Sequence, residues 1–128
     1  MYAGIPDINW LGIYVLRPPD LVLGPYQGQP ACVRMPLGRG VCGTAAEEQE
    51  TLRVDNVHEF AGHIVCDPLS VSEIVVPLVL HGRLVGVLDI DSPVAARFGE
   101  TDQRGVESLC NTFLRHLEKD ARGAADFI

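Results

Sequence analysis

Hydrophobic residues occur along most of the chain in short runs rich in β-branched and aromatic residues, and they follow a clear helical spacing only near the C-terminus. Such runs, bounded by turn residues, predict strands. His81 and Gly82 form a two-residue connection of the length that closes a hairpin between the last two runs. Pro77, in the first arm of this hairpin, favours a bulge or an edge position. The predicted strands cover residues 8–16, 21–27, 31–36, 51–54, 73–80 and 83–91.

Two helices are predicted between and after these strands. The first, at residues 41–50, is rich in Ala and Glu, and the second covers residues 101–119. The second repeats apolar residues at i, i+3 and i+4, and its expected buried stripe consists of Val106, Leu109, Cys110, Phe113, Leu114 and Leu117. Cys110 is therefore expected to be a small core residue. The order of elements predicts one α+β domain over residues 1–128, with a central, mainly antiparallel sheet flanked by helices.

Charge and composition exclude several classes of protein. The net charge is −7 and no cluster of basic residues occurs, so nucleic-acid binding is not expected. The apolar run at residues 74–80 is too short to span a membrane, and the N-terminus lacks the basic and then apolar order of a secretory signal. A cytoplasmic location follows as the expectation. In that reducing compartment the four cysteines should be thiols unless the chemistry of the protein uses them.

Two ligand-binding patterns are present but incomplete. Residues 38–43 match G-x-G-x-x-G, yet the next acidic candidate, Asp55, follows only 12 residues after Gly43 instead of about 20. These glycines are instead expected to make a tight turn close to a ligand or another chain segment. His63 and Cys66 have the spacing of half a zinc site, whose second half is missing. No metal and no organic cofactor is therefore expected.

The cysteines differ in their local surroundings. Cys42 lies at the start of the first predicted helix, where backbone N–H groups and the helix dipole favour a thiolate. Packing as a small apolar residue explains Cys42 equally well. Cys66 lies in an irregular segment beside Asp67, whose charge would raise the pKa of the thiol. Local sequence alone therefore does not mark Cys66 as reactive.

A pair of acids in the last strand is the strongest chemical signal. Asp89 and Asp91 alternate, so their side chains share a face about 7 Å apart along the backbone. Strand interiors disfavour Asp. The pair is therefore either a solvated strand end or two carboxyls that share one proton near neutral pH. Glu73 can join the pair, and Trp10 and Tyr14 share a face of the first strand.

The chain resembles the free methionine-(R)-sulfoxide reductases, which are built on a GAF fold, in five segments: INWLGIYVL, LGPYQGQPACVRMPLGRGVCGTAA, VDNVHEFAGHIVCD, SEIVVPL and GVLDIDSP. The resemblance runs over residues 9–102, and generic GAF domains lack its combination of three cysteines with the Leu-Asp-Ile-Asp strand. It implies thiol-dependent reduction of free L-methionine-(R)-sulfoxide through a cysteine sulfenic acid and an intramolecular disulfide. The alternative is a non-catalytic GAF sensor that binds a small ligand or acts as a redox switch.

The resemblance also implies roles for individual residues. Cys66 would be the catalytic thiol, Cys32 the resolving thiol, and Cys42 a third thiol that can join the exchange. Whether Cys32 or Cys42 is the main resolving thiol is left open. A thioredoxin-type protein would be the reductant, and a homodimer is compatible with the fold. The helical segment that usually precedes the first strand is expected to be missing, with the pocket intact. The implied substrate pocket is lined by Trp10, Tyr14, Glu73, Asp89 and Asp91.

Overall fold

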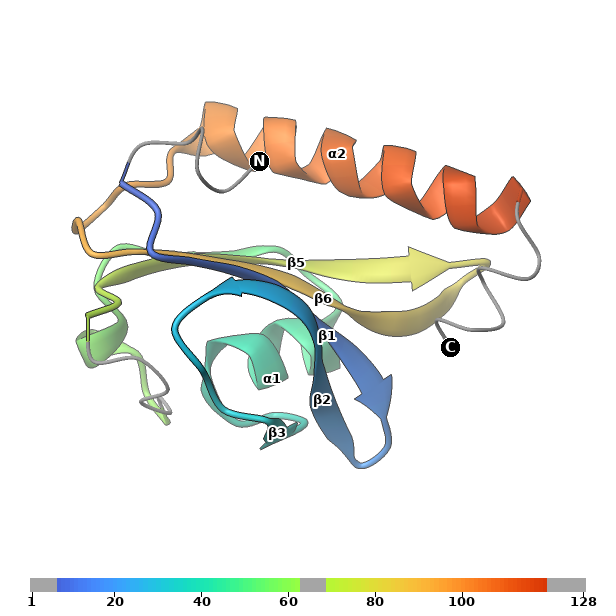
Figure 1. Ribbon diagram of the computed structural model, residues 1–128, viewed down its shortest axis with the longest axis horizontal. Helices are drawn as coiled ribbons and strands as arrows, with labels where there is room; N and C mark the ends of the chain where they lie inside the picture. The colour runs from blue at the N-terminus through green and yellow to red at the C-terminus, as the bar shows by residue number, and fades with distance from the viewer. Residues whose placement is uncertain (1–6, 63–68, 120–128) are drawn as a thin grey trace.

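The computed structural model describes residues 7–62 and 69–119. Six strands form one antiparallel sheet in the order β3-β2-β1-β6-β5-β4, and the two α-helices of these residues pack on its opposite faces (Figure 1). This confirms the α+β class with an antiparallel sheet. The elements are β1 (Trp10–Arg17), β2 (Asp20–Gly28), β3 (Arg34–Pro36), α1 (Gly40–Glu48), β4 (Leu52–Val54), the 3₁₀ helix η2 (Val57–Glu59), β5 (Ser72–Leu80), β6 (Arg83–Ser92) and α2 (Glu100–Lys119).

The central hairpin forms as its sequence predicts. His81 and Gly82 both have positive φ, 53° and 75°, as a two-residue turn of the hairpin type requires. Pro77 is tolerated in β5 because the neighbouring strand β4 pairs only with residues 73–75. At Pro77 the sheet therefore ends on one side, and the missing N–H interrupts no ladder there. A bulge follows between Leu78 and Val79, as the proline suggested.

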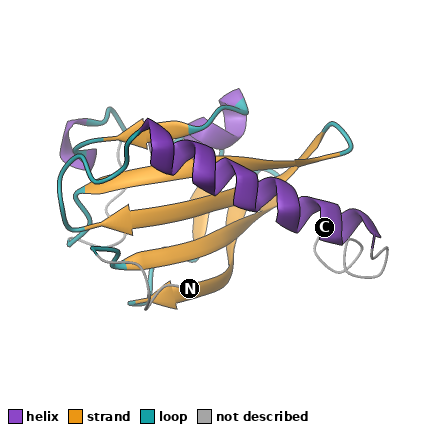
Figure 2. Cartoon of the chain, turned by 90° about the horizontal axis from the view of Figure 1, so that it is seen from above, coloured by secondary structure: helices purple, strands orange, loops and turns teal. Residues whose placement is uncertain are grey.

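Helix α2 covers one face of the sheet with an apolar core (Figure 2). Cys110 is buried in this core, as expected, and burial followed by the charge of Glu107 raises the pKa of its thiol to about 12. Leu109 departs from the predicted stripe because 45% of it is exposed at the edge of the helix contact. No helix among residues 7–62 and 69–119 is long and apolar enough to cross a membrane. The buried residues of this face are Ile74, Val76, Leu78, Leu80, Val85, Leu88, Ile90, Phe98, Cys110 and Leu114.

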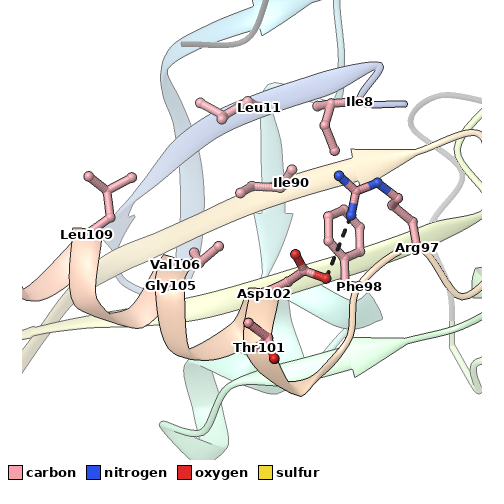
Figure 3. A pocket seen from close by; sticks show the side chains of 10 residues that line it. All are labelled: Ile8, Leu11, Ile90, Arg97, Phe98, Thr101, Asp102, Gly105, Val106 and Leu109. Atoms are coloured by element: carbon pink, nitrogen blue, oxygen red, sulfur yellow. Dashed lines mark ion pairs between the residues drawn. The ribbon is translucent and has the colours of Figure 1, made fainter. Parts of the chain in front are cut away.

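The start of α2 is fixed by one acid. Asp102 accepts a hydrogen bond of 2.8 Å from the backbone N–H of Gly99 and pairs with Arg97 at 3.7 Å (Figure 3). A carboxylate in the first turn satisfies a free N–H group and interacts well with the helix dipole. Beside it, a mostly apolar hollow of about 280 Å³ lies between α2 and strands β1 and β6. This hollow is on the face of the sheet opposite to the acidic residues described below.

Helix α1 covers the other face, and its small residues allow a close approach. Gly43 lies against the backbone of Pro36, where a Cβ would come within 2.5 Å of the carbonyl oxygen. The glycines of this turn therefore pack against another chain segment, as predicted. The preceding strand is shorter than the predicted 31–36, since β3 begins only at Arg34. The buried residues of this face are Trp10, Tyr14, Leu21, Met35, Val41, Cys42, Ala45, Ala46, Val75 and Val87.

Candidate functional site

The register of three central strands brings three acids together on the α1 face. Asp91 of β6 lies opposite Trp10 of β1 on one side and opposite Glu73 of β5 on the other. Asp89 is two residues earlier in β6 and lies opposite Gly12 and Val75. The three carboxyl groups therefore form a compact group, called here the acid cluster: Glu73, Asp89 and Asp91.

The acid cluster is buried. Only 8% of Glu73, 5% of Asp89 and 9% of Asp91 is exposed. The interpretation of the aspartates as a solvated strand end is therefore wrong. Among the described residues, Oδ1 of Asp89 and Oδ1 of Asp91 have no hydrogen-bond partner, and no salt bridge to a basic side chain is found for either. Buried charges are costly without compensation, so the cluster is suited to a cationic ligand or a retained proton.

Both aspartates favour the protonated form. Burial first, and then the charges of Asp91 and Glu73, raise the pKa of Asp89 well above its usual range. Burial and the charge of Glu73 also raise the pKa of Asp91, while hydrogen bonds with Asp89 and then with Ser70 act in the opposite direction. The predicted pair that keeps a proton near neutral pH is thus consistent with the geometry.

Ser70 distinguishes the two aspartates, and sequence reasoning missed it. Its hydroxyl accepts a hydrogen bond of 3.1 Å from Nδ2 of Asn9 and lies 3.2 Å from Oδ2 of Asp91. Since Asn9 supplies the donor on one side, the Ser70 proton is available to Asp91. Asp91 therefore has a hydroxyl donor that stabilises its charged form. Among residues 7–62 and 69–119, no hydroxyl group donates to Asp89. Ser70 is 61 residues away from Asn9 in the chain, so no local pattern announces this contact.

Cys42 contacts the acid cluster from α1. Its Sγ donates toward Oε2 of Glu73 at 3.8 Å. Burial, and then the charges of Asp89 and Glu73, raise the pKa of this thiol well above its usual value. The expectation of a thiolate at the helix start is therefore wrong for the free protein, because burial and adjacent carboxylates outweigh the helix dipole.

Aromatic rings form a second wall beside the acids. Trp10 stacks between Tyr14 and Tyr26, with ring centroids 5.8 Å apart in both pairs. Gly12 makes room for the indole, because a Cβ at this position would collide with the ring. The indole N–H donates to the carbonyl of Gln29 at 3.1 Å, which fixes the ring orientation. Tyr26 was missed from sequence, although its pairing with Gly12 in the antiparallel register places it there.

The cysteines implied by the resemblance are only partly within the described residues. Cys32 is half-buried at the edge of the α1-face core, and its carbonyl accepts a 3.0 Å hydrogen bond from the hydroxyl of Tyr14. Burial and the charge of Asp89 raise the pKa of Tyr14, so this hydroxyl stays a donor. Cys66 and His63 lie outside the described residues. The catalytic and resolving roles therefore stay predictions.

Comparison with known proteins gives the family. The model of the GAF domain family matches residues 3–116. The free methionine-R-sulfoxide reductase of Escherichia coli is 53% identical over 109 residues, which cover 85% of this chain and 66% of that enzyme. The chain belongs to the free methionine-R-sulfoxide reductase family of GAF domains. The resemblance inferred from sequence is thus confirmed.

Solved structures of the family agree. The free methionine-R-sulfoxide reductase of Neisseria meningitidis, in complex with its substrate, superposes with a TM-score of 0.87 at 43% identity, covering 90% of this chain and 70% of that one. The substrate complex of the Staphylococcus aureus enzyme gives a TM-score of 0.84 at 47% identity, covering 88% and 74%. This chain spans just under two thirds of the E. coli enzyme, 66% of its length.

Proposed function

We propose that this protein reduces free L-methionine-(R)-sulfoxide to L-methionine with a cysteine thiol. The observation that carries the proposal is the acid cluster, buried beside stacked aromatic rings without a basic partner among the described residues. Free methionine sulfoxide offers an ammonium cation for the acids and an aliphatic chain with a terminal methyl group for the rings. Relatives that carry the name of this activity support the same substrate.

The substrate would bind through both of its charged groups. Its ammonium group would lie against the acid cluster, where it supplies the positive charge that the carboxyls need. Its carboxylate would meet backbone N–H groups around residues 40–43, at the start of α1. The methyl sulfoxide end would place its methyl group against Trp10 and Tyr14. Selectivity for the free amino acid follows, because a residue within a peptide has no ammonium group.

The proposed reaction uses thiols and one proton from the acid cluster. The thiolate of Cys66 attacks the sulfoxide sulfur while a protonated carboxyl, Asp89 or Asp91, gives its proton to the oxygen. The oxygen is then transferred from the substrate sulfur to the sulfur of Cys66, the bond between the two sulfurs breaks, methionine is released and Cys66 becomes a sulfenic acid. The thiol of Cys32 then condenses with this sulfenic acid, a disulfide forms and water leaves. Cys42 is a third thiol that can join the exchange.

A dithiol reductant must return two electrons and two protons to each disulfide. We propose a thioredoxin-type protein for this step, in the cytoplasm, where disulfides are reduced. The whole chain 1–128 would act as one GAF-like domain, alone or as a homodimer.

The test compares kcat/KM for three substrates: free methionine-(R)-sulfoxide, its N-acetyl form and the (S) epimer, with dithiothreitol as reductant. Acetylation removes the positive charge and leaves the acids without a partner. We expect kcat/KM to fall by more than about 100-fold, which corresponds to the cost of leaving a buried charge without its partner. Equal activity on the N-acetyl form would contradict the proposed binding mode.

The thiols are tested by substitution. Cys66→Ser should abolish turnover, whereas Cys32→Ser should release about one methionine per chain without reductant and recycle poorly. Cys110→Ser is the control, since Cys110 lies in the core of the α2 face. If every variant and the wild type bind methionine sulfoxide and none turns it over, the chain is a sensor domain instead.

A further inference from the structure

One thiol and two carboxyls of the site have the arrangement of metal ligands. Cys42, Glu73 and Asp89 each offer one atom, and the three atoms lie within 4.8 Å of one another. They come from three elements, α1, β5 and β6, which the packing of the α1 face holds together. All three residues are buried.

The separation of Cys42 and Glu73 is close to that of two ligands in a tetrahedral zinc site. With Zn–S of about 2.3 Å and Zn–O of about 2.1 Å, a tetrahedron places sulfur and oxygen about 3.6 Å apart. The observed separation of Sγ of Cys42 and Oε2 of Glu73 is 3.8 Å. All three ligand atoms lie within 4.8 Å of one another, so side-chain shifts of about 1 Å are needed to bring them to one centre. The fourth position is left for water or a further oxygen ligand.

An independent feature also points to a bound cation. Only 5% of Asp89 is exposed, and its Oδ1 has no hydrogen-bond partner among the described residues. The strand register directs this carboxyl to the face that α1 and Cys42 cover. A buried acceptor without a donor is costly, and a cation between Asp89 and Cys42 would satisfy it.

We propose that Cys42, Glu73 and Asp89 bind a divalent ion of borderline softness, with Zn²⁺ as the best match, in place of the ammonium-bearing ligand. A sulfur ligand and few oxygens disfavour Mg²⁺ and Ca²⁺, which require six or more oxygen ligands. Binding converts the thiol to a thiolate and releases its proton to solvent, together with any proton that the two carboxyls hold. Affinity for the ion therefore rises with pH. Metal binding itself does not depend on the proposed function, whereas its competition with methionine sulfoxide does.

The test uses a chain in which Cys42 is the only thiol. Cys32, Cys66 and Cys110 are replaced by Ser, circular dichroism checks the fold, and the reduced protein is titrated with Co²⁺ as a spectroscopic probe. One equivalent of Co²⁺ should produce a thiolate-to-cobalt charge-transfer band, which Zn²⁺ then removes. Glu73→Gln and Asp89→Asn in this background should weaken binding by at least about 10- to 100-fold. Asp20→Asn, on the exposed surface pair with Arg34, is the matched control and should bind as tightly as its parent.

A second pair of variants guards against loss of the fold. In the chain with all other thiols present, Cys42→Ser should lose the band and Cys110→Ser should keep it. A band that survives in Cys42→Ser, or its absence from the folded single-thiol chain, would overturn the metal site. Methionine sulfoxide should raise the apparent Kd for Zn²⁺. Tight Zn²⁺ binding that methionine sulfoxide does not affect would keep the metal site and refute the substrate position proposed above.

Discussion

The two faces of β6 are equally buried but chemically different. On the α2 face, Leu88 is 7% and Ile90 is 5% exposed, while on the α1 face Asp89 is 5% and Asp91 is 9% exposed. The first pair gains free energy when it leaves water. The second pair loses free energy unless a ligand or a proton compensates its charge. Neighbouring residues of one strand thus stabilise the fold on one face and belong to the proposed binding site on the other.

The helices match this division. α2 is long and packs an apolar stripe, with Cys110 and Leu114 buried, onto the sheet. α1 is short, and its buried residues are small. Small side chains let α1 approach the acid cluster closely, and Cys42 reaches Glu73 at 3.8 Å. The difference teaches that burial alone does not identify the core: the kind of atom that is buried separates stabilising contacts from functional ones.

The largest predicted effect contrasts adjacent residues of β6. Asp89→Asn removes a group that can donate the proton to the sulfoxide, so kcat/KM should fall by about 10² to 10⁴. Ile90→Val, one residue later on the opposite face, should keep activity and lower the free energy of unfolding by about 0.5 to 1.5 kcal/mol. Steady-state kinetics and urea unfolding of both variants measure the contrast. If Ile90→Val loses as much activity as Asp89→Asn, the two faces are not functionally separate.

The second prediction concerns stability, where Asp89→Asn should have the opposite sign. The pKa of Asp89 is higher in the folded protein than in the unfolded chain, where it is about 3.9. The stability that Asp89 contributes is therefore fully present below about pH 3.9, and it is lost as the pH rises through the pKa of the folded state. Asn carries no such charge. At pH 8 the variant should therefore be more stable than wild type, and the difference should shrink toward pH 5.

Urea unfolding at both pH values measures this difference. Asp20→Asn is the control, because Asp20 forms a surface ion pair with Arg34 at 3.0 Å. Loss of this ion pair should lower the free energy of unfolding by less than about 1 kcal/mol. A less stable Asp89→Asn at pH 8 would show that the buried carboxyl does not strain the fold.

Local patterns predicted much of this arrangement. Alternation placed Asp89 and Asp91 on one face, and the two-residue turn at His81 and Gly82 fixed the hairpin. Cys110 was found in the core because helical spacing shows directly which side of a helix is apolar. These features depend on residues close in sequence, where periodicity and turn chemistry act.

Contacts between distant segments were not predictable in the same way. The acidity of Cys42 was judged from its helix start. Burial raises the pKa of this thiol most, followed by the charges of Asp89 and Glu73, which lie 47 and 31 residues later in the chain (89 − 42 and 73 − 42). Tyr26 and Ser70 joined the site through strand register and a hydrogen bond across 61 residues. Periodicity gives the face of a side chain, but it does not give the residue packed against that face.

The smallest predicted effect isolates Ser70 as a positioning residue. Its hydroxyl, 3.2 Å from Oδ2 of Asp91, stabilises the charged form of that carboxyl. Ser70→Ala removes this donor, so the pKa of Asp91 should rise further and the aspartate pair should keep its proton to higher pH. Because the proposed reaction needs that proton, the high-pH decrease of kcat/KM should move upward, by about one pH unit for a hydrogen bond to a charged group.

Two further variants separate this effect from a general loss of packing. Ser70→Thr keeps the hydroxyl and should restore the wild-type pH profile. Ser72→Ala is the matched control, because Ser72 is buried nearby but donates to the carbonyl of Val94 at 2.6 Å, away from the acids. It should lower stability and leave the profile in place. An unchanged pH profile in Ser70→Ala, or an equal shift in Ser72→Ala, would contradict the positioning role. Ser70 would then only fill space beside Asp91, and its hydroxyl would have no effect on the pKa values of the two aspartates.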